Sequence, residues 1–192
     1  RNCEQLSFQG TGNILTIKKN NDGSIQILFN GEDRTEEIKK NGSFYDEKTA
    51  KVTRVGNAQS SYTTTTTTNL GDANITVTGA SSLTGKAEVQ TTKAINVNTN
   101  SKLNATGAIN AGSITADAST ITGASITSNQ KLSATNGGSI SAINGNLTAN
   151  HITVTTGSTV NATGTITTYG IAANNGKIKA GNLTANSLSI WD

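Results

Sequence analysis

Acidic side chains are scarce from residue 71 to the end of the chain. Enzymes that cleave polysaccharides use clustered carboxylates, often beside a lysine or an arginine. From residue 71 onward the acidic residues are Asp72, Glu88, Asp117 and Asp192. No two of them share a face on adjacent units of the repeat that runs through this part of the chain. The sequence therefore predicts a protein that is not an enzyme and has no catalytic residues.

The single histidine and the single cysteine offer no metal or redox centre. His151 directly precedes an inward-facing position at Ile152, and no second His or Cys is near it, so we expect a solvated corner residue. Cys3 has no partner within the chain, which leaves a free thiol or a bridge to another molecule. The abundant Ser and Thr residues have no histidine beside them for activation. We expect no metal and no cofactor.

Composition excludes several further classes of protein. The chain has 192 residues, of which 33% are hydrophobic, and its net charge is only +3, so nucleic acid is not an expected partner. No segment approaches the roughly 18 apolar residues of a membrane span. The chain begins at Arg1 and contains no Met, which fits a mature product after removal of a signal peptide. We expect an extracellular or cell-surface location.

An aliphatic residue returns about every nineteen positions in three interleaved series. Steps within a series run from 17 to 21 residues. A fixed period of this size, in units that cannot bury an apolar face alone, is typical of a β-solenoid. The first series is Ile75, Ile95, Ile114, Leu132, Ile152, Ile171, Ile190; the second is Leu83, Leu103, Ile121, Ile140, Val160, Ile178; the third is Val89, Ile109, Ile126, Leu147, Ile166, Leu183.

Each coil contains three short segments in which an aliphatic residue is followed two positions later by a small or aliphatic one. In Ile95-Asn96-Val97, for example, alternation with period two places the two aliphatic residues inside and the asparagine outside. Glycines recur between segments, where the chain must turn. The sequence predicts an all-β fold, a parallel β-solenoid of about six three-sided coils of roughly 19 residues, with a β-rich cap at its N-terminal side.

Threonines on the outer surface form a second regular feature. One outward slot of the third segment holds Thr127, Thr148, Thr167 and Thr184, which we interpret as a candidate threonine ladder between coils. Flat Thr-x-Thr arrays on solenoids can bind ice. Only two of the six outward pairs on the first segment match that pattern, Thr76/Thr78 and Thr153/Thr155, so ice binding is an alternative hypothesis. A polysaccharide-binding or polysaccharide-cleaving β-helix is a further alternative.

The first 70 residues have the chemistry of an ordinary globular segment. They hold 9 of the 15 basic residues and five of the seven aromatic ones. Aliphatic residues in 13–29 predict an antiparallel hairpin turning at Asp22-Gly23, and residues 31–40 form either a loop or one helical turn capped by Thr35. We divide the chain into a β-rich cap (1–62), a threonine-rich strand or spacer (63–70) and the solenoid (71–192).

The repeats resemble those of a known group of bacterial surface proteins. Segments such as 139–149, SISAINGNLTA, and 158–164, STVNATG, are similar to the coils of filamentous-haemagglutinin-type adhesins. The resemblance covers residues 71–192. It implies a right-handed parallel β-helix, the hand that strand chirality also favours, exposed at a bacterial surface, with host or surface glycans among its partners. Bactofilin-like polymers of solenoid subunits are equally compatible with these repeats.

The ends of the predicted solenoid indicate how it could act. Isolated solenoids carry polar caps, yet this chain stops at Leu188-Ser189-Ile190-Trp191-Asp192, within a coil. We take Leu188, Ile190 and Trp191 as a candidate assembly interface, to which a bridge at Cys3 could contribute. Trp191 could equally form a lid over the last coil. The open end fits either a piece of a longer solenoid array or an end that docks on another subunit. The sequence predicts a secreted structural solenoid, either a surface adhesin or a subunit of a self-assembling fibre that stacks head to tail through its open ends.

Overall fold

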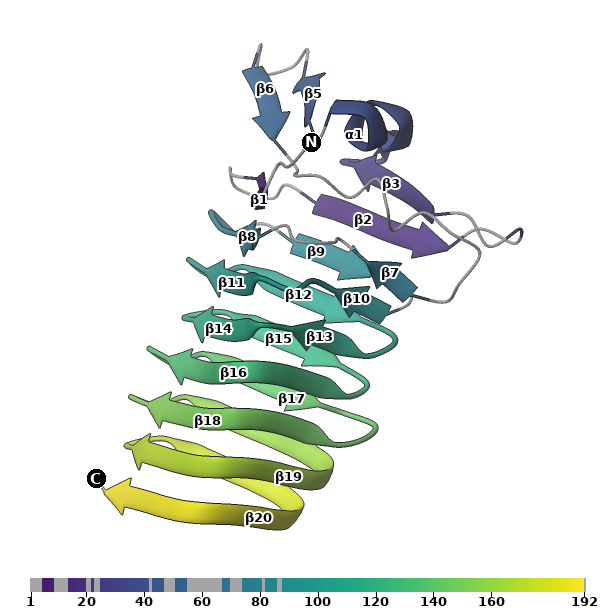
Figure 1. Cartoon of the computed structure of the whole chain (residues 1–192). Helices are drawn as coiled ribbons and strands as arrows, with labels where there is room; N and C mark the ends of the chain where they lie inside the picture. Colours follow the sequence, from purple (N-terminus) through teal and green to yellow (C-terminus); the bar gives the residue numbers. More distant parts are fainter. Residues whose placement is uncertain are drawn as a thin grey trace.

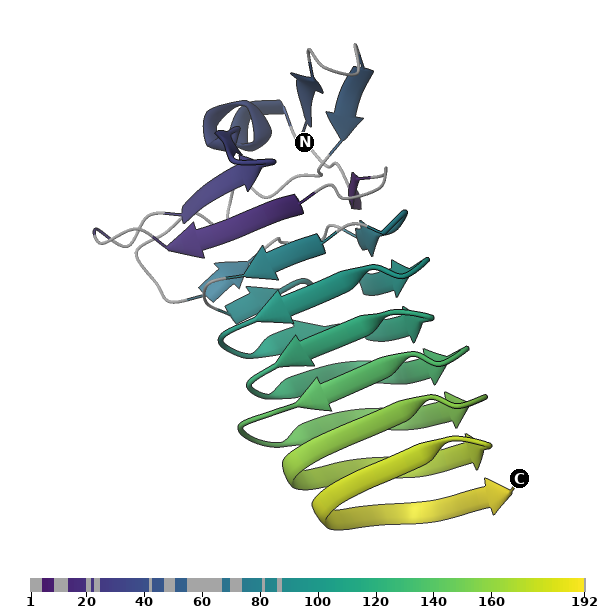
Figure 2. The same cartoon turned by 180° about the vertical axis from the view of Figure 1, so that it is seen from behind.

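The structure is a computed structural model that describes residues 5–8, 14–19, 22, 25–41, 43–46, 51–54, 67–69, 74–80, 82–85 and 88–191. It is a β-solenoid of about six turns with a spacing of about 19 residues, which confirms the predicted fold class. Short parallel strands stack along one axis, with a cap at one end and the last coil at the other (Figures 1 and 2). Within the described part of the chain, no helix is long and apolar enough to cross a membrane.

Each turn contributes one strand to each of three faces. Face 1 consists of β1 (Gln5–Phe8), β8 (Asn74–Val77), β11 (Ala94–Asn98), β14 (Ser113–Asp117) and the last parts of β16 (Ile126–Thr135), β18 (Leu147–Thr155), β19 (Thr159–Asn174) and β20 (Lys177–Trp191). Face 2 consists of β2 (Ile14–Lys19), β9 (Ser82–Gly85), β12 (Lys102–Ala105), β15 (Thr120–Gly123), β17 (Ser139–Ala142) and the first parts of β19 and β20. Face 3 consists of β7 (Thr67–Asn69), β10 (Glu88–Gln90), β13 (Ile109–Ala111), the first parts of β16 and β18 and the middle parts of β19 and β20.

The core is a set of columns in which each aliphatic residue lies directly over its equivalent in the next coil. Leu83, Leu103 and Ile121, for example, occupy successive register positions on face 2 and are fully buried. Burial alternates residue by residue within the strands, as the period of two requires. The inner positions two residues later carry small side chains such as Ala105 and Ala142, which keep the interior narrow.

One member of the predicted series is wrong. Ile171 pairs with Leu188, whereas Ile190 pairs with Ala173, so Leu188 rather than Ile190 continues the first series. The reason is a register shift at the preceding corner, where Gly181 alone stands opposite two residues of the coil above, Thr163 and Gly164. A shorter corner moves every later residue of the last coil forward in register.

The corners use residues other than glycine more often than we expected. At the corner between faces 1 and 2, Asn100, Asn136 and Asn175 adopt left-handed φ angles of 59°, 52° and 57°. Asparagine tolerates this region because its short polar side chain bonds locally. Gly112 serves another purpose, since a Cβ atom there would collide with the carbonyl oxygen of Thr92 in the coil above.

The ladder of strands extends upstream of residue 71. β1 pairs in parallel with β8, β2 with β9, and β7 with β10, so these three strands together form a further turn. Between β2 and β7 the chain leaves this turn to build the cap. The cap contains β3 (Ile25–Phe29), β4 (Glu32–Asp33), α1 (Thr35–Asn41) and a hairpin of β5 (Ser43–Asp46) and β6 (Lys51–Arg54). The division of the chain at residues 62 and 70 stays a prediction.

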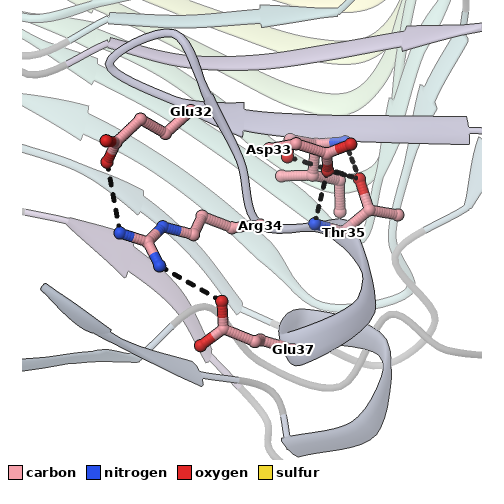
Figure 3. Close-up of polar contacts among 6 residues, drawn as sticks. Glu32, Asp33, Arg34, Thr35 and Glu37 are labelled. Atoms are coloured by element: carbon pink, nitrogen blue, oxygen red, sulfur yellow. Dashed lines mark hydrogen bonds and ion pairs between the residues drawn. The ribbon is translucent and has the colours of Figure 1, made fainter.

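The predicted hairpin is present, with β2 and β3 antiparallel and Ile17 opposite Ile27. The following segment is a helix of seven residues, longer than the single turn we expected. Asp33, rather than Thr35, caps it, because the Asp33 carboxylate accepts the Thr35 N–H at 2.9 Å (Figure 3). The Thr35 hydroxyl instead accepts the N–H of Ile27 on β3 at 2.8 Å and so ties the helix to the hairpin.

Replacing a residue of an inner column should destabilise the solenoid far more than replacing its outward neighbour. Leu103→Ala should lower the free energy of unfolding by about 3 kcal/mol, because Leu103 is fully buried between two other leucine or isoleucine side chains. Asn104→Ala, on the outer side of the same strand, should change it by less than about 0.5 kcal/mol. Urea denaturation of both variants measures the difference, and equal midpoints would contradict the assigned alternation.

Candidate interaction surfaces

Ionisable groups are spread thinly over the described residues. These residues contain no group of three or more His, Cys, Asp or Glu side chains that could hold a metal ion. The ion pairs within them are in the cap, where Arg34 bonds Glu37 at 3.1 Å and Glu32 at 3.2 Å (Figure 3). Asp72, Asp192 and Cys3 lie outside the described residues. The absence of catalytic function stays a prediction.

The corner between faces 1 and 2 carries a polar ladder that joins adjacent coils. The Asp117 carboxylate accepts hydrogen bonds from the Thr135 hydroxyl at 3.0 Å and from the Asn136 side-chain amide at 2.6 Å. Nearer the cap, the Thr78 hydroxyl donates to the Asn98 side-chain oxygen. These side chains bridge coils, so several outward positions of face 1 already have partners within the protein. Ice binding through this face stays a prediction.

The candidate threonine ladder lies on face 3 in consecutive register. Thr127 is paired with Thr148, Thr148 with Thr167, and Thr167 with Thr184. Thr127 is half-buried, and the other three are exposed. The column is therefore a row of hydroxyl and methyl groups on an outer surface, separated by the strand spacing of about 4.8 Å.

His151 and Tyr169 form an aromatic contact at the corner between faces 3 and 1. Their ring centroids are 5.6 Å apart in an edge-to-face arrangement, and Tyr169 is 57% exposed. Gly170 stands next to His151 in register, and a Cβ atom at that position would lie 3.3 Å from the imidazole ring. His151 is an exposed corner residue, as its position before Ile152 indicates. Sequence reasoning missed Tyr169, because its partner His151 belongs to the preceding coil.

The last coil exposes inner positions whose equivalents in the coil above are buried. Leu183 is 44% exposed, Leu188 52% and Ile190 63%, whereas Ile166 and Ile171 in the coil above are buried. Leu188 and Ile190 both occupy inner positions on β20, with Ser189 facing outward between them, and no described segment covers them. Trp191 pairs with Asn174, an outward position, and is 48% exposed, so the described structure does not place it as a lid over the coil.

The strand edge of the last coil is also open. β20 is 15 residues long and pairs on one side with β19, and the described residues contribute no strand to its other side. Because backbone groups of a strand alternate between its two neighbours, about half of them on β20 face this edge. The edge contains no proline, and its lysines, Lys177 and Lys179, are confined to the start. Features that usually block pairing are absent from Ala180 to Trp191.

The two ends of the ladder differ. On face 2 at the cap end, β2 is paired on its outer side by the antiparallel strand β3, so that edge is occupied. Behind it Ile27, Phe29 and Ile38 form a buried extension of the core. In the described structure the cap end is thus covered on face 2, whereas the edge of β20 is open on all three faces.

Comparison with known proteins found no relative of this chain. No protein-family model, no curated protein and no solved structure matches the chain. The solenoid is therefore established by the coil register, and the likeness of residues 71–192 to adhesin repeats remains a resemblance of repeat style.

The Asp117 ladder should contribute measurably to stability through its two hydrogen bonds. Asp117→Ala should lower the free energy of unfolding by about 1–2 kcal/mol, because it leaves the Thr135 hydroxyl and the Asn136 amide without this acceptor. Asp117→Asn retains a side-chain oxygen and should lose less than Asp117→Ala. Thermal denaturation followed by circular dichroism compares the two, and an equal loss would show that charge rather than the acceptor matters.

Proposed function

We propose that this protein is a structural rod of the extracellular or cell-surface space whose terminal coil associates with another β-coil. The observation that carries the proposal is the open edge of β20, with Leu183, Leu188 and Ile190 exposed at inner positions. The continuous parallel pairing of successive coils from β8 to β20 supports a mechanical role, because the inner positions fill the core and the corners join coil to coil. The location outside the cell rests on the resemblance of the repeats.

A further coil on β20 would cover the groups that a neighbouring coil covers elsewhere in the solenoid. It would cover three aliphatic side chains and satisfy the alternate backbone groups of the edge. Full burial of one aliphatic side chain contributes about 1.5–3 kcal/mol, and roughly half of each of these remains exposed. Residues of a longer chain or a second copy could supply this coil.

For the 192-residue chain we propose a second copy as the partner. The covered edge at the cap end favours contact between two β20 edges over head-to-tail stacking, because β3 occupies the position that an incoming strand on face 2 would need. Two identical edges can meet about a two-fold axis, with their strands antiparallel. Surface attachment, the adhesin hypothesis, is compatible with such a pair and rests on the repeat resemblance.

A charge placed at an inner position of the edge should abolish the association. Ile190→Lys should convert assemblies to monomers at micromolar concentration, because stacking a coil there would bury an unpaired ammonium group. Ser189→Lys, which adds the same charge at the neighbouring outward position, should assemble like the unmodified chain. Sedimentation velocity and negative-stain electron microscopy measure the particles, and emission of Trp191 should shift to shorter wavelength on association.

Two outcomes would contradict the proposal. The unmodified chain could remain monomeric across the concentration range, or Ile190→Lys could assemble as the unmodified chain does. Fibres that lengthen with concentration would retain the association but replace the two-fold contact by head-to-tail stacking.

A further inference from the structure

Ile143 departs from the pattern that places aliphatic side chains inside the coils. It is 58% exposed, and among the large hydrophobic side chains described between residues 74 and 180 it is the one aliphatic that is exposed. It lies at the corner between faces 2 and 3, in a turn of four residues between β17 and β18. The corresponding corner between β15 and β16 has only two residues, Ala124 and Ser125. The longer turn carries Ile143 on the outer surface.

Hydrogen bonds to the coils on both sides hold this turn in place. The N–H of Ile143 donates to the Gly123 carbonyl at 2.9 Å. On the other side, the N–H of Gly164 donates to the Gly145 carbonyl at 2.9 Å, and the N–H of Thr165 donates to the Asn146 side-chain oxygen at 2.8 Å. The backbone that carries Ile143 is already ordered, so binding through this side chain has little conformational entropy left to lose.

An open hollow of about 370 Å³ lies beside Ile143 on the side of the cap. Small residues, Gly85, Ala105 and Ala124, contribute to its lining together with the threonines Thr106 and Thr122. None of the described residues that line it is charged. An aliphatic side chain that contacted these residues would therefore displace water without covering a charged group among them.

A second hollow, of about 580 Å³, lies on the other side of Ile143 and suits an aliphatic side chain less well. Its lining includes Lys179, an exposed cation near the last coil. An aliphatic group placed there would take water away from the ammonium group, which is costly. The uncharged hollow is therefore the better receptor.

We infer that the corner between faces 2 and 3 is a lateral contact surface for a second copy of this chain, in which Ile143 of each chain enters the uncharged hollow of the other. One surface here carries both the projecting side chain and a hollow next to it. This is the self-complementarity that a two-fold interface requires, since each chain must offer what the other needs. A different protein could bind through Ile143 alone or through the hollow alone, and would not require both.

This inference does not depend on the open edge of β20. The corner faces sideways from the rod axis, and Ile143 belongs to a coil with described neighbours above and below. A lateral pair can therefore form whether or not the terminal coils associate. The two contacts together would link rods both end to end and side by side.

The test uses the full chain carrying Ile190→Lys, which removes the end contact, and measures mass by sedimentation equilibrium. We expect a concentration-dependent dimer in this background. Ile143→Asn should weaken dimerisation at least tenfold, and Thr122→Arg, which places a long charged side chain in the hollow, should do the same. Thr120→Arg is the matched control, because residue 120 lies on the same strand but does not line the hollow. It should dimerise as the parent does.

Circular dichroism and the thermal midpoint establish that each variant is folded. A monomeric parent at all concentrations would overturn the inference, as would a dimer that neither Ile143→Asn nor Thr122→Arg weakens. Equal weakening by Thr120→Arg and Thr122→Arg would also overturn it, because the hollow would then have no specific part. Failure of the end contact is recognised separately, from the chain without Ile190→Lys.

Discussion

The structure depends on one repeated interaction, the parallel pairing of each strand with its equivalent one coil away. This pairing aligns equivalent positions of successive coils, so an inner residue of a middle coil is covered by inner residues above and below. Leu103, for instance, is fully buried because Leu83 and Ile121 are its register partners. Small inner residues such as Ala105 and Ala142 keep the interior narrow, which explains how a chain that is 33% hydrophobic can build a continuous core.

The same pairing limits where the protein can interact with others. Inner positions fill the core, and many corner groups bond to the next coil, as the Asp117 carboxylate does with Thr135 and Asn136. Binding surfaces therefore arise where the repeat changes. The turn at Ile143 is longer than its equivalents, the aromatic contact of His151 and Tyr169 depends on Gly170, and the last coil lacks a described neighbour. At each of these places a large side chain is exposed: Ile143 at the turn, Tyr169 at the aromatic contact and Leu188 in the last coil.

The cap end shows how a globular segment joins a repetitive one. The chain forms two strands of a turn, leaves to build a hairpin and a helix, and returns with β7 to supply the third strand. β3 pairs antiparallel with β2 and so ends the parallel stack on that face, while Ile38 of α1 closes the core behind it. A change from parallel to antiparallel pairing is an effective stop, because the next coil can no longer continue in register.

The sequence alone determined the three-sided coil and most of its inner columns, because burial with period two within a coil of fixed length leaves a pattern along the chain. It also predicted the β2–β3 hairpin and the register of the threonines on face 3. Tertiary structure alone decided the rest. The pairing of Leu15 with Leu83 spans the inserted cap, and the position of Ile190 follows from a corner shortened at Gly181. Sequence periodicity reveals which residues alternate within a strand. The pairing across the cap and the register of the last coil depend instead on contacts between distant residues and on corner lengths, which are settled only when the chain folds.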